Sequence, residues 1–262
     1  MGAHSHAFRG SFGHWKDVIY LLVSRDFRGR YKHTRVGMLW SLASPVMFLL
    51  IFYFLFQRVI DLDIPRYASY AFTGIVVWNW TQQALTASVS SISSNQALVA
   101  QPGFPVATLP IISVTSSMLN LAIAFPLLLL LAWIDGAQIT LVIVALPIVV
   151  VTQFLLILAI AYIIAAINVS LRDVEQILPI ALQLGYYMTP IFFSLSNVPA
   201  EFHGVFLANP MTHIITAYRD LVMYGHWPAW TSLGIIMAGS ILLLMLGVRI
   251  FKHARYRFLE EL

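Results

Sequence analysis

Six long apolar stretches alternate with shorter polar segments along this chain. They run about Val36–Gln57, Tyr67–Ser90, Pro110–Trp133, Ile139–Asn168, Gln176–Ser194 and Trp230–Phe251. A helix needs about 20 apolar residues to cross the hydrocarbon core of a bilayer, and each stretch is about that long or longer. The pattern therefore predicts an all-α polytopic membrane protein with six transmembrane helices. Six crossings would leave both chain ends on the same side of the membrane.

Composition supports a membrane protein and excludes a soluble one. Of the 262 residues, 60% are hydrophobic and 10% are charged, which is more apolar side chain than a soluble domain of this size can bury. The apolar stretches follow one another without a polar gap the size of a domain. We therefore expect a single transmembrane domain over residues 1–262. The chain has no cysteine, which excludes disulfides and thiolate metal sites.

The distribution of basic residues predicts the orientation in the membrane. Lys and Arg number seven in residues 1–35, one between spans four and five, four after Val248 and three on the opposite side. Cytoplasmic loops of membrane proteins carry an excess of Lys and Arg, so both termini are expected in the cytoplasm. This assigns 36–194 to spans one to five, 195–229 to an outer region, 230–251 to span six and 252–262 to a cytoplasmic tail.

The segment before the first span, residues 1–35, has the pattern of an amphipathic interfacial helix. Four of its basic residues recur at helical spacings of three, four and three, which places on one face Arg25, Arg28, Lys32 and Arg35. Leu22 and Val23 belong to a separate apolar face, and such a helix suits the headgroup layer of an anionic membrane. Two interpretations remain open: simple anchoring of the first span, or a further role in gating or partner contact.

The outer region, residues 195–229, contains two short helical signals. Asn209 can cap a helix, Pro210 suits its first turn and Gly225 lies just past its end. Residues Pro199–Leu207 could form a second helix. We expect the pair to be a re-entrant helical hairpin that dips into the outer leaflet, because such short apolar segments rarely lie free in water. The alternative is a surface loop with interfacial helices.

Several kinds of chemistry are missing from the chain. No phosphate-binding loop, dinucleotide-binding glycine motif or metal-binding histidine spacing occurs in the sequence, so we expect no cofactor in this chain and no nucleic-acid partner. The Asp, Glu, Lys and Arg residues fall outside the six spans or at their ends. Ion-coupled transporters usually keep such a group at membrane depth; the driving energy is therefore expected to come from another subunit. The rival hypothesis is an integral membrane glycan or lipid transferase.

Aromatic residues at membrane depth suggest the cargo. Trp78 and Trp80 lie about 16–20 Å along span two at 1.5 Å per residue, and Tyr186 and Tyr187 are similarly deep in span five. Aromatic rings can stack against the apolar faces of sugar rings. The sequence therefore predicts a channel lined by aromatic residues, to which the outer part of span one would add Tyr53 and Phe56. The alternative for each of them is packing against lipid or other helices.

Three motifs in order resemble the transmembrane subunit of polysaccharide-type ATP-binding-cassette exporters. The first runs from Ser24-Arg-Asp-Phe-Arg to Gly37-Met-Leu-Trp and Pro45. The second, Asn168-Val-Ser-Leu-Arg-Asp, is similar to a cytoplasmic turn between spans four and five. The third is Thr189-Pro-Ile-Phe-Phe with the later Val198-Pro and Asn209-Pro-Met. Together these motifs cover most of the chain in the family's order.

The resemblance implies roles for two sets of residues. A gate helix at the cytoplasmic surface, where a lipid-linked substrate is expected to enter, would contain Arg25, Asp26, Arg28, Arg30, Lys32 and Arg35. Contact with a separate nucleotide-binding subunit would involve Asn95, Gln96, Gln101, Phe104, Arg172 and Asp173. The family commonly carries Lys or Arg before the Phe-Pro of this coupling loop, whereas Gln101-Pro-Gly stands here. We therefore expect this loop to contact the nucleotide-binding subunit through complementary shape and hydrogen bonds.

The resemblance also implies how the protein works. We expect a homodimer in the inner membrane of a bacterium, which forms a channel for a lipid-linked polysaccharide, O-antigen in preference to capsule or teichoic acid. ATP and magnesium would bind the partner subunit. A related exporter of small lipids or drugs is the closest alternative.

Overall fold

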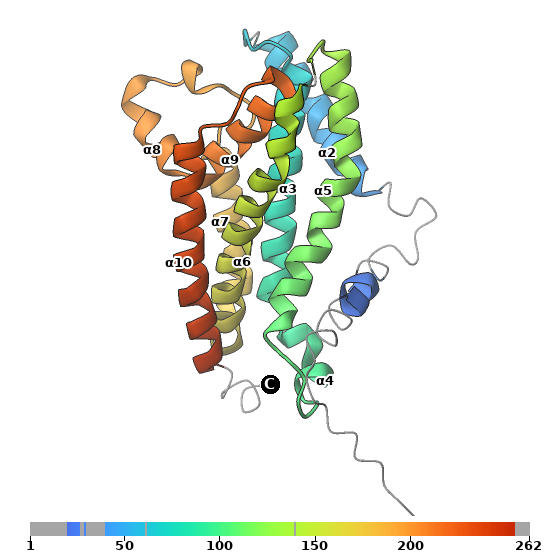
Figure 1. Cartoon of the computed structure of the whole chain (residues 1–262), viewed down its shortest axis with the longest axis vertical. Coiled ribbons are helices and arrows are strands. Elements are labelled where there is room, and N and C mark those ends of the chain that lie inside the picture. The colour runs from blue at the N-terminus through green and yellow to red at the C-terminus, as the bar shows by residue number, and fades with distance from the viewer. Residues whose placement is uncertain (1–19, 27–28, 30–39, 61, 139, 255–262) are drawn as a thin grey trace, which may run out of the picture.

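The protein is a bundle of long helices, described here from a computed structural model over residues 20–26, 29, 40–60, 62–138 and 140–254. Within these residues all regular structure is helical, which confirms the predicted all-α class (Figure 1). The long helices are α2 (Trp40–Tyr53), α3 (Tyr67–Val89), α5 (Thr108–Ile134), α6 (Leu146–Ser170), α7 (Asp173–Tyr187) and α10 (Trp230–Ala254). The π-helix η2 (Phe54–Val59) continues α2, and the short 3₁₀ turn η4 (Leu141–Ala145) precedes α6.

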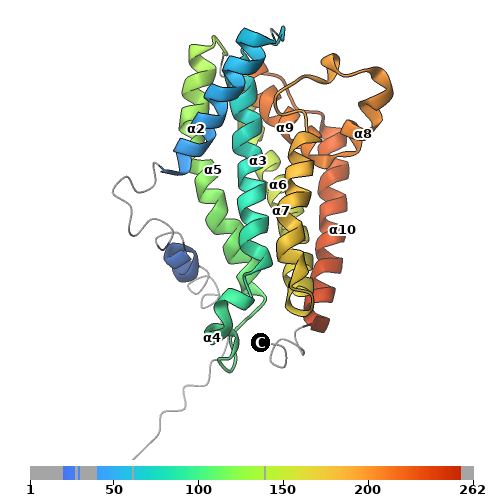
Figure 2. The ribbon, with the colours of Figure 1, turned by 180° about the vertical axis from the view of Figure 1, so that it is seen from behind.

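Short helices lie between the long ones at the two ends of the bundle. At one end are η3 (Ser93–Asn95) and α4 (Gln96–Val99). At the other are η5 (Leu195–Asn197), η6 (Ala200–Phe202), α8 (His203–Ala208), α9 (Pro210–Arg219) and η7 (Asp220–Tyr224). Figures 1 and 2 show the helical residues 20–26, α4 and the last turn of α10 toward one end, and α8 and α9 at the opposite end. Which end faces the cytoplasm stays a prediction.

Four helical segments of the described chain are long and apolar enough to cross a membrane: Leu42–Val59, Thr108–Ile134, Leu141–Ser170 and Trp230–Ala254. The helix α3 has 23 residues, but its amide and hydroxyl side chains make it less apolar. The helix α7 has 15 residues. Both run along the bundle beside the other four (Figure 2). The chain is therefore a polytopic membrane protein by composition and structure, and a count of six spans stays a prediction.

The fifth predicted span is shorter than the sequence suggested. Its helix, α7, ends at Tyr187, whereas the prediction continued to Ser194. Pro190 explains the difference, because a proline disfavours the helical conformation of the residue before it. The Thr189 hydroxyl donates to the Gly185 carbonyl at 2.7 Å, and the chain then turns across the end of the bundle.

The helix α3 occupies the centre of the bundle. It contacts α2, α5, α6, α7 and α9, and most of its side chains are buried. A buried polar network fixes it to its neighbours: the Gln153 amide of α6 donates to the Val77 carbonyl and to the Thr81 hydroxyl, each at 3.0 Å. The Tyr218 hydroxyl of α9 donates to Gln153 at 3.0 Å. Each polar group is satisfied, as a low-dielectric interior requires.

The N-terminus of α3 is capped by a residue distant in sequence. Asp135 Oδ2 accepts from the Ser69 backbone N–H at 3.0 Å and also from the Ser69 hydroxyl. A carboxylate there satisfies an unpaired N–H and interacts favourably with the helix dipole. Arg66, left-handed at φ 56°, donates to the Met223 carbonyl at 2.6 Å and the Gly136 carbonyl at 3.1 Å. Three outer segments are joined by these contacts.

The outer helix pair forms as the sequence predicted. The Asn209 side chain caps α9 by accepting from the Met211 N–H at 3.0 Å, Pro210 stands in the first turn, and Gly225 ends the segment at φ 63°. The helix α9 is embedded in the bundle, because Ile214, Ile215 and Tyr218 are all 0% exposed. Its depth in the membrane remains a prediction.

Candidate functional site

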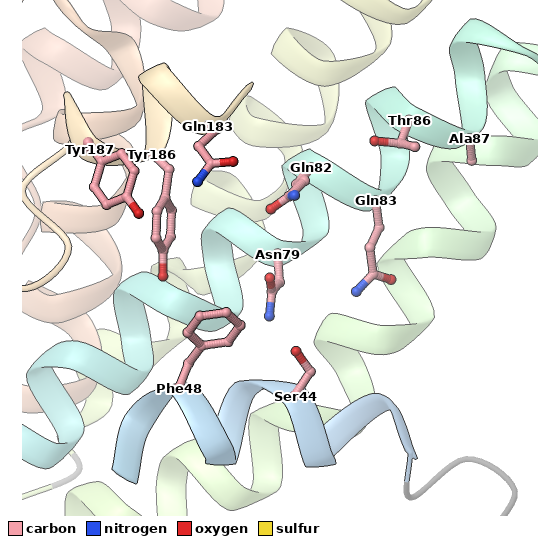
Figure 3. A pocket seen from close by; sticks show the side chains of 10 residues that line it. All are labelled: Ser44, Phe48, Asn79, Gln82, Gln83, Thr86, Ala87, Gln183, Tyr186 and Tyr187. Carbon is pink, nitrogen blue, oxygen red and sulfur yellow. The ribbon is translucent and has the colours of Figure 1, made fainter. Parts of the chain in front are cut away.

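A groove of about 600 Å³ opens between α2, α3 and α7. Figure 3 shows that Ser44 and Phe48 of α2 face Asn79 of α3 across it, while α7 contributes Gln183, Tyr186 and Tyr187. The floor is α3, which adds Gln82, Gln83, Thr86 and Ala87. The groove therefore lies along the second half of the central helix, toward the end that leads to α4.

Polar residues at helical spacing on α3 form the polar side of this groove. Asn79, Gln82, Gln83 and Thr86 follow spacings of three and four, so they share one face of the helix. The opposite face carries fully buried side chains such as Val77 and Ala84, which are both 0% exposed. The tight packing of one face holds the amides of the other toward the groove.

None of the ten residues that line the groove in the described structure carries a charge. Eight of them bear a hydroxyl, phenol or amide group. An amide offers two donors and an acceptor, and a hydroxyl offers one donor and accepting lone pairs. The groove can therefore exchange hydrogen bonds with a polar, uncharged molecule without presenting a fixed charge to it.

The α7 aromatics predicted for the channel do line this groove. Tyr186 is half-buried and Tyr187 is exposed, with their ring centroids 5.7 Å apart, edge to face. Trp78 lies behind Tyr186, with centroids 5.8 Å apart. Gly185 lets Trp78 approach, because a Cβ there would lie 3.0 Å from Trp78 Cη2. Trp78 is itself 4% exposed and supports Tyr186 from inside the bundle.

The other predicted channel aromatics are packed differently. Trp80 donates to the Val114 carbonyl at 3.3 Å and packs against Phe154 of α6. Its position in the core, on the face of α3 away from the groove, gives it a packing role in this chain. Tyr53 and Phe56 are half-buried, with ring centroids 6.3 and 6.4 Å from Tyr67. Both join α2 and η2 to the outer end of α3.

A polar contact connects the groove to α5 and thence to the N-terminal segment. Asn120 of α5 donates from its amide to Gln83 Oε1, which orients a groove amide. One turn away, the Ser116 hydroxyl donates to the Asp26 carboxylate. Of the predicted gate residues, Arg25 is exposed and Asp26 is partly buried in this contact. The remaining four, Arg28, Arg30, Lys32 and Arg35, lie outside the described residues.

The predicted coupling residues gather at the end of the bundle opposite α8 and α9. Asn95, whose amide donates to the Ser91 carbonyl at 2.9 Å, precedes α4. Gln96 and Gln101 are exposed, while Phe104 is partly buried. Arg172 and Asp173 are exposed at the turn from α6 to α7 (Figure 1). These exposed side chains are available to a soluble partner at one end of the bundle.

A buried arginine fixes the outer end. Arg219 of α9 is 3% exposed, and it donates to the Pro190 and Ile191 carbonyls, both at 2.9 Å, and twice to the Tyr70 carbonyl, at 3.2 and 3.3 Å. Its Cζ lies 3.4 Å from the centroid of the Tyr70 ring, a cation–π contact. Burial lowers the pKa of the guanidinium below its usual value, and the carbonyl dipoles compensate its charge.

Sequence reasoning did not identify the amides Asn79, Gln82, Gln83 and Gln183, which make up much of the site. Their spacing of three and four along an apolar span was the available signal. Among the described residues no group of three or more His, Asp or Glu side chains is arranged to hold a metal ion. The site is thus a hydrogen-bonding and stacking surface.

Comparison with known proteins matches residues 17–223 to the ABC-2 type transporter membrane domain. The chain belongs to the ABC-2 type transporter family. The O-antigen export system permease protein RfbA of Myxococcus xanthus is 31% identical over 250 residues, which cover 95% of this chain and 96% of that protein.

Two further relatives match this ABC-2 type chain over nearly its whole length. RfbA of Klebsiella pneumoniae is 28% identical, over 96% of this chain and 97% of its own. The polysialic acid transport protein KpsM of Escherichia coli is 24% identical, over 93% of this chain and 96% of its own length. The groove, α4 and the outer helix pair all fall within the aligned length of a family of membrane transport proteins.

Proposed function

We propose that this chain is the membrane permease subunit of an ATP-driven exporter of lipid-linked polysaccharide in a bacterial inner membrane. Two copies form the channel, a separate subunit hydrolyses ATP, and both termini face the cytoplasm. O-antigen is the favoured cargo, because the relatives named for O-antigen export are 28–31% identical and the one named for polysialic acid is 24% identical. Transport by this family also argues against the membrane transferase.

The observation that carries the proposal is the uncharged groove of α2, α3 and α7. A polysaccharide must pass a membrane without leaving its hydroxyls unsatisfied, since a buried polar group without a partner is costly. The amides of α3 and α7 can replace water around those hydroxyls, and Tyr186 and Tyr187 can stack on the sugar rings. Drugs and small lipids have far fewer hydroxyls to match this lining.

What the chain lacks and where its exposed residues lie both support a separate ATPase. The sequence contains no phosphate-binding loop, and the described charged residues avoid the middle of the long helices. Energy must then arrive mechanically at one end. The α4 region and the turn with Arg172 and Asp173 supply exposed side chains for that contact, as expected for coupling by shape and hydrogen bonds.

Purification of the tagged full chain from its native membrane tests the proposal. We expect a stoichiometric ATPase to accompany a dimer of this chain, and lipid-linked glycan to stimulate its hydrolysis of ATP. Inactivation of that ATPase should abolish export of the polymer to the cell surface. A solitary chain that modifies lipid or sugar without ATP would contradict the proposal, as would export that continues with the inactive ATPase.

A further inference from the structure

The lining of the groove bears on which kinds of glycan it can accept, a question that goes beyond transport itself. Four of its ten residues are amides: Asn79, Gln82, Gln83 and Gln183. Among the described residues, no side-chain hydrogen bond occupies the amides of Asn79, Gln82 or Gln183. Gln83 is held by Asn120 of α5, so one amide is oriented while the other three have no side-chain partner among the described residues. Figure 3 shows these side chains around one open space.

A sugar hydroxyl and an amide are well matched. Each can donate and accept, so a neutral glycan can slide and rotate while partners are exchanged along Asn79, Gln82 and Gln183. The rings of Phe48, Tyr186 and Tyr187 offer apolar faces to the sugar between its hydroxyls. Neither kind of contact requires a fixed sugar sequence.

A carboxylate meets a different environment in the same groove. Among the described residues, none that lines the groove is Lys, Arg or His, so an anionic sugar would give up water there without gaining a cation. Desolvation of an unpaired charge is far more costly than that of a hydroxyl. The phenol faces add a further penalty, because the faces of aromatic rings carry partial negative charge.

We propose that this groove selects uncharged, hydroxyl-rich glycans and rejects polymers that carry a carboxylate on each sugar. The inference rests on the proposed function, since it names the substrate class of the same groove. The selecting groups are Asn79, Gln82 and Gln183, and the discrimination is electrostatic. One lysine introduced among them is expected to reverse it.

The test compares two probes with one backbone: oligogalacturonate as the free acid and as its full methyl ester. Binding of each to the full chain in lipid nanodiscs, with its accompanying ATPase, is measured by titration at pH 7. We expect the ester to bind about tenfold more tightly, because only the acid brings an unpaired charge into the groove. The chain has a formal net charge of +4, so non-specific attraction would favour the acid instead.

Lysine variants test whether the groove residues cause the preference for the ester. Gln82→Lys is expected to raise affinity for the acid about tenfold and to lower that for the ester, because the ammonium pairs with the carboxylate. Gln183→Lys repeats the test from α7 in case the first variant is poorly folded. Gln138→Lys, the same change at an exposed outer position, should leave the preference of the wild type unchanged.

The outcomes separate the selectivity from the proposed function. Equal affinity for the two probes, or tighter binding of the acid by the wild type, overturns the neutral selectivity while leaving glycan transport intact. The same follows if Gln138→Lys changes the preference as much as Gln82→Lys does. If neither probe binds and neither stimulates ATP hydrolysis, the groove is not a glycan path, and the proposed function fails as well.

Discussion

At the scale of single residues, buried polar side chains decide how the outer end is built. Arg219 ties α9 to the turn after α7 and to α3 through three carbonyl groups. Gly74 makes this possible, because a Cβ there would lie 2.9 Å from Ile191 Cγ2 and 3.1 Å from Arg219 Nη2. One charged side chain therefore joins three elements, where the sequence pattern shows only an Arg in a short outer helix.

Replacement of Arg219 by methionine is expected to destabilise the protein by about 3 kcal/mol, since each buried carbonyl left without a donor costs about 1–3 kcal/mol. Arg219→Lys should recover only part of the loss, because an ammonium cannot reproduce the planar fork of a guanidinium. Thermal unfolding of the purified protein in detergent measures the effect. Arg58→Met is the control, since Arg58 is exposed. Equal midpoints for Arg219→Met and Arg58→Met would show that the buried contacts contribute nothing.

At the scale of elements, close approach between helices is set by small residues. The helices α6 and α10 form the most extensive pair in the bundle. At their crossing, a Cβ on Gly247 would lie 3.0 Å from the Ala159 carbonyl oxygen and 3.2 Å from Tyr162 Cβ. Small residues let helix backbones approach in this way within membranes. The contact fixes α10 against the bundle.

Gly247→Val should push α10 away from α6 and destabilise the fold by about 1–3 kcal/mol through overpacking. Gly239→Val supplies a matched control on the same helix, because nothing lies within 4 Å of a Cβ at that position. The yield of monodisperse protein from membranes and its thermal midpoint report the difference. If both valine variants behave alike, the close crossing is not a determinant of stability.

At the scale of the whole molecule, the two ends of the bundle differ in character. One end carries α4 and the exposed Arg172, and the other carries α8 and α9, which pack over the bundle (Figures 1 and 2). Lys and Arg counts predict that the first end faces the cytoplasm. The groove lies along the half of α3 nearer the first end.

The absence of native cysteine makes the orientation directly testable. Single substitutions Gln101→Cys and Ser196→Cys fall at exposed positions on opposite ends. In spheroplasts, a membrane-impermeant maleimide is expected to label Ser196→Cys at once and Gln101→Cys only after lysis. The cysteine-free parent protein controls for background. Immediate labelling of Gln101→Cys would invert the orientation, and labelling of both before lysis would contradict a topology with the two loops on opposite sides.

The sequence by itself determined the elements, their capping and the family resemblance. Long apolar runs predicted α3, α5, α10 and the pair η4 and α6 within a few residues, because helical hydrogen bonds in a membrane must be satisfied within each segment. The Asn209 cap and the end of the outer segment at Gly225 also depend only on residues close in sequence. The motifs around Arg172 and Thr189 indicated the transmembrane subunit of a polysaccharide-type ATP-binding-cassette exporter, and the match to the ABC-2 type transporter family agrees with it. The end of α7 was missed, although Pro190 marked it.

Only the tertiary structure decided which side chains meet. Trp80 and Tyr186 are both aromatic and deep in a helix, yet Trp80 is 1% exposed in the core and Tyr186 lines the groove. The contact of Gln83 with Asn120 and the position of Gln183 beside α3 depend on how three helices rotate against one another. The hydrophobic periodicity and the composition of a segment determine which helix it forms, but not how that helix is rotated against its neighbours. The facing of α2, α3 and α7 is fixed by packing between them, and that packing creates the groove.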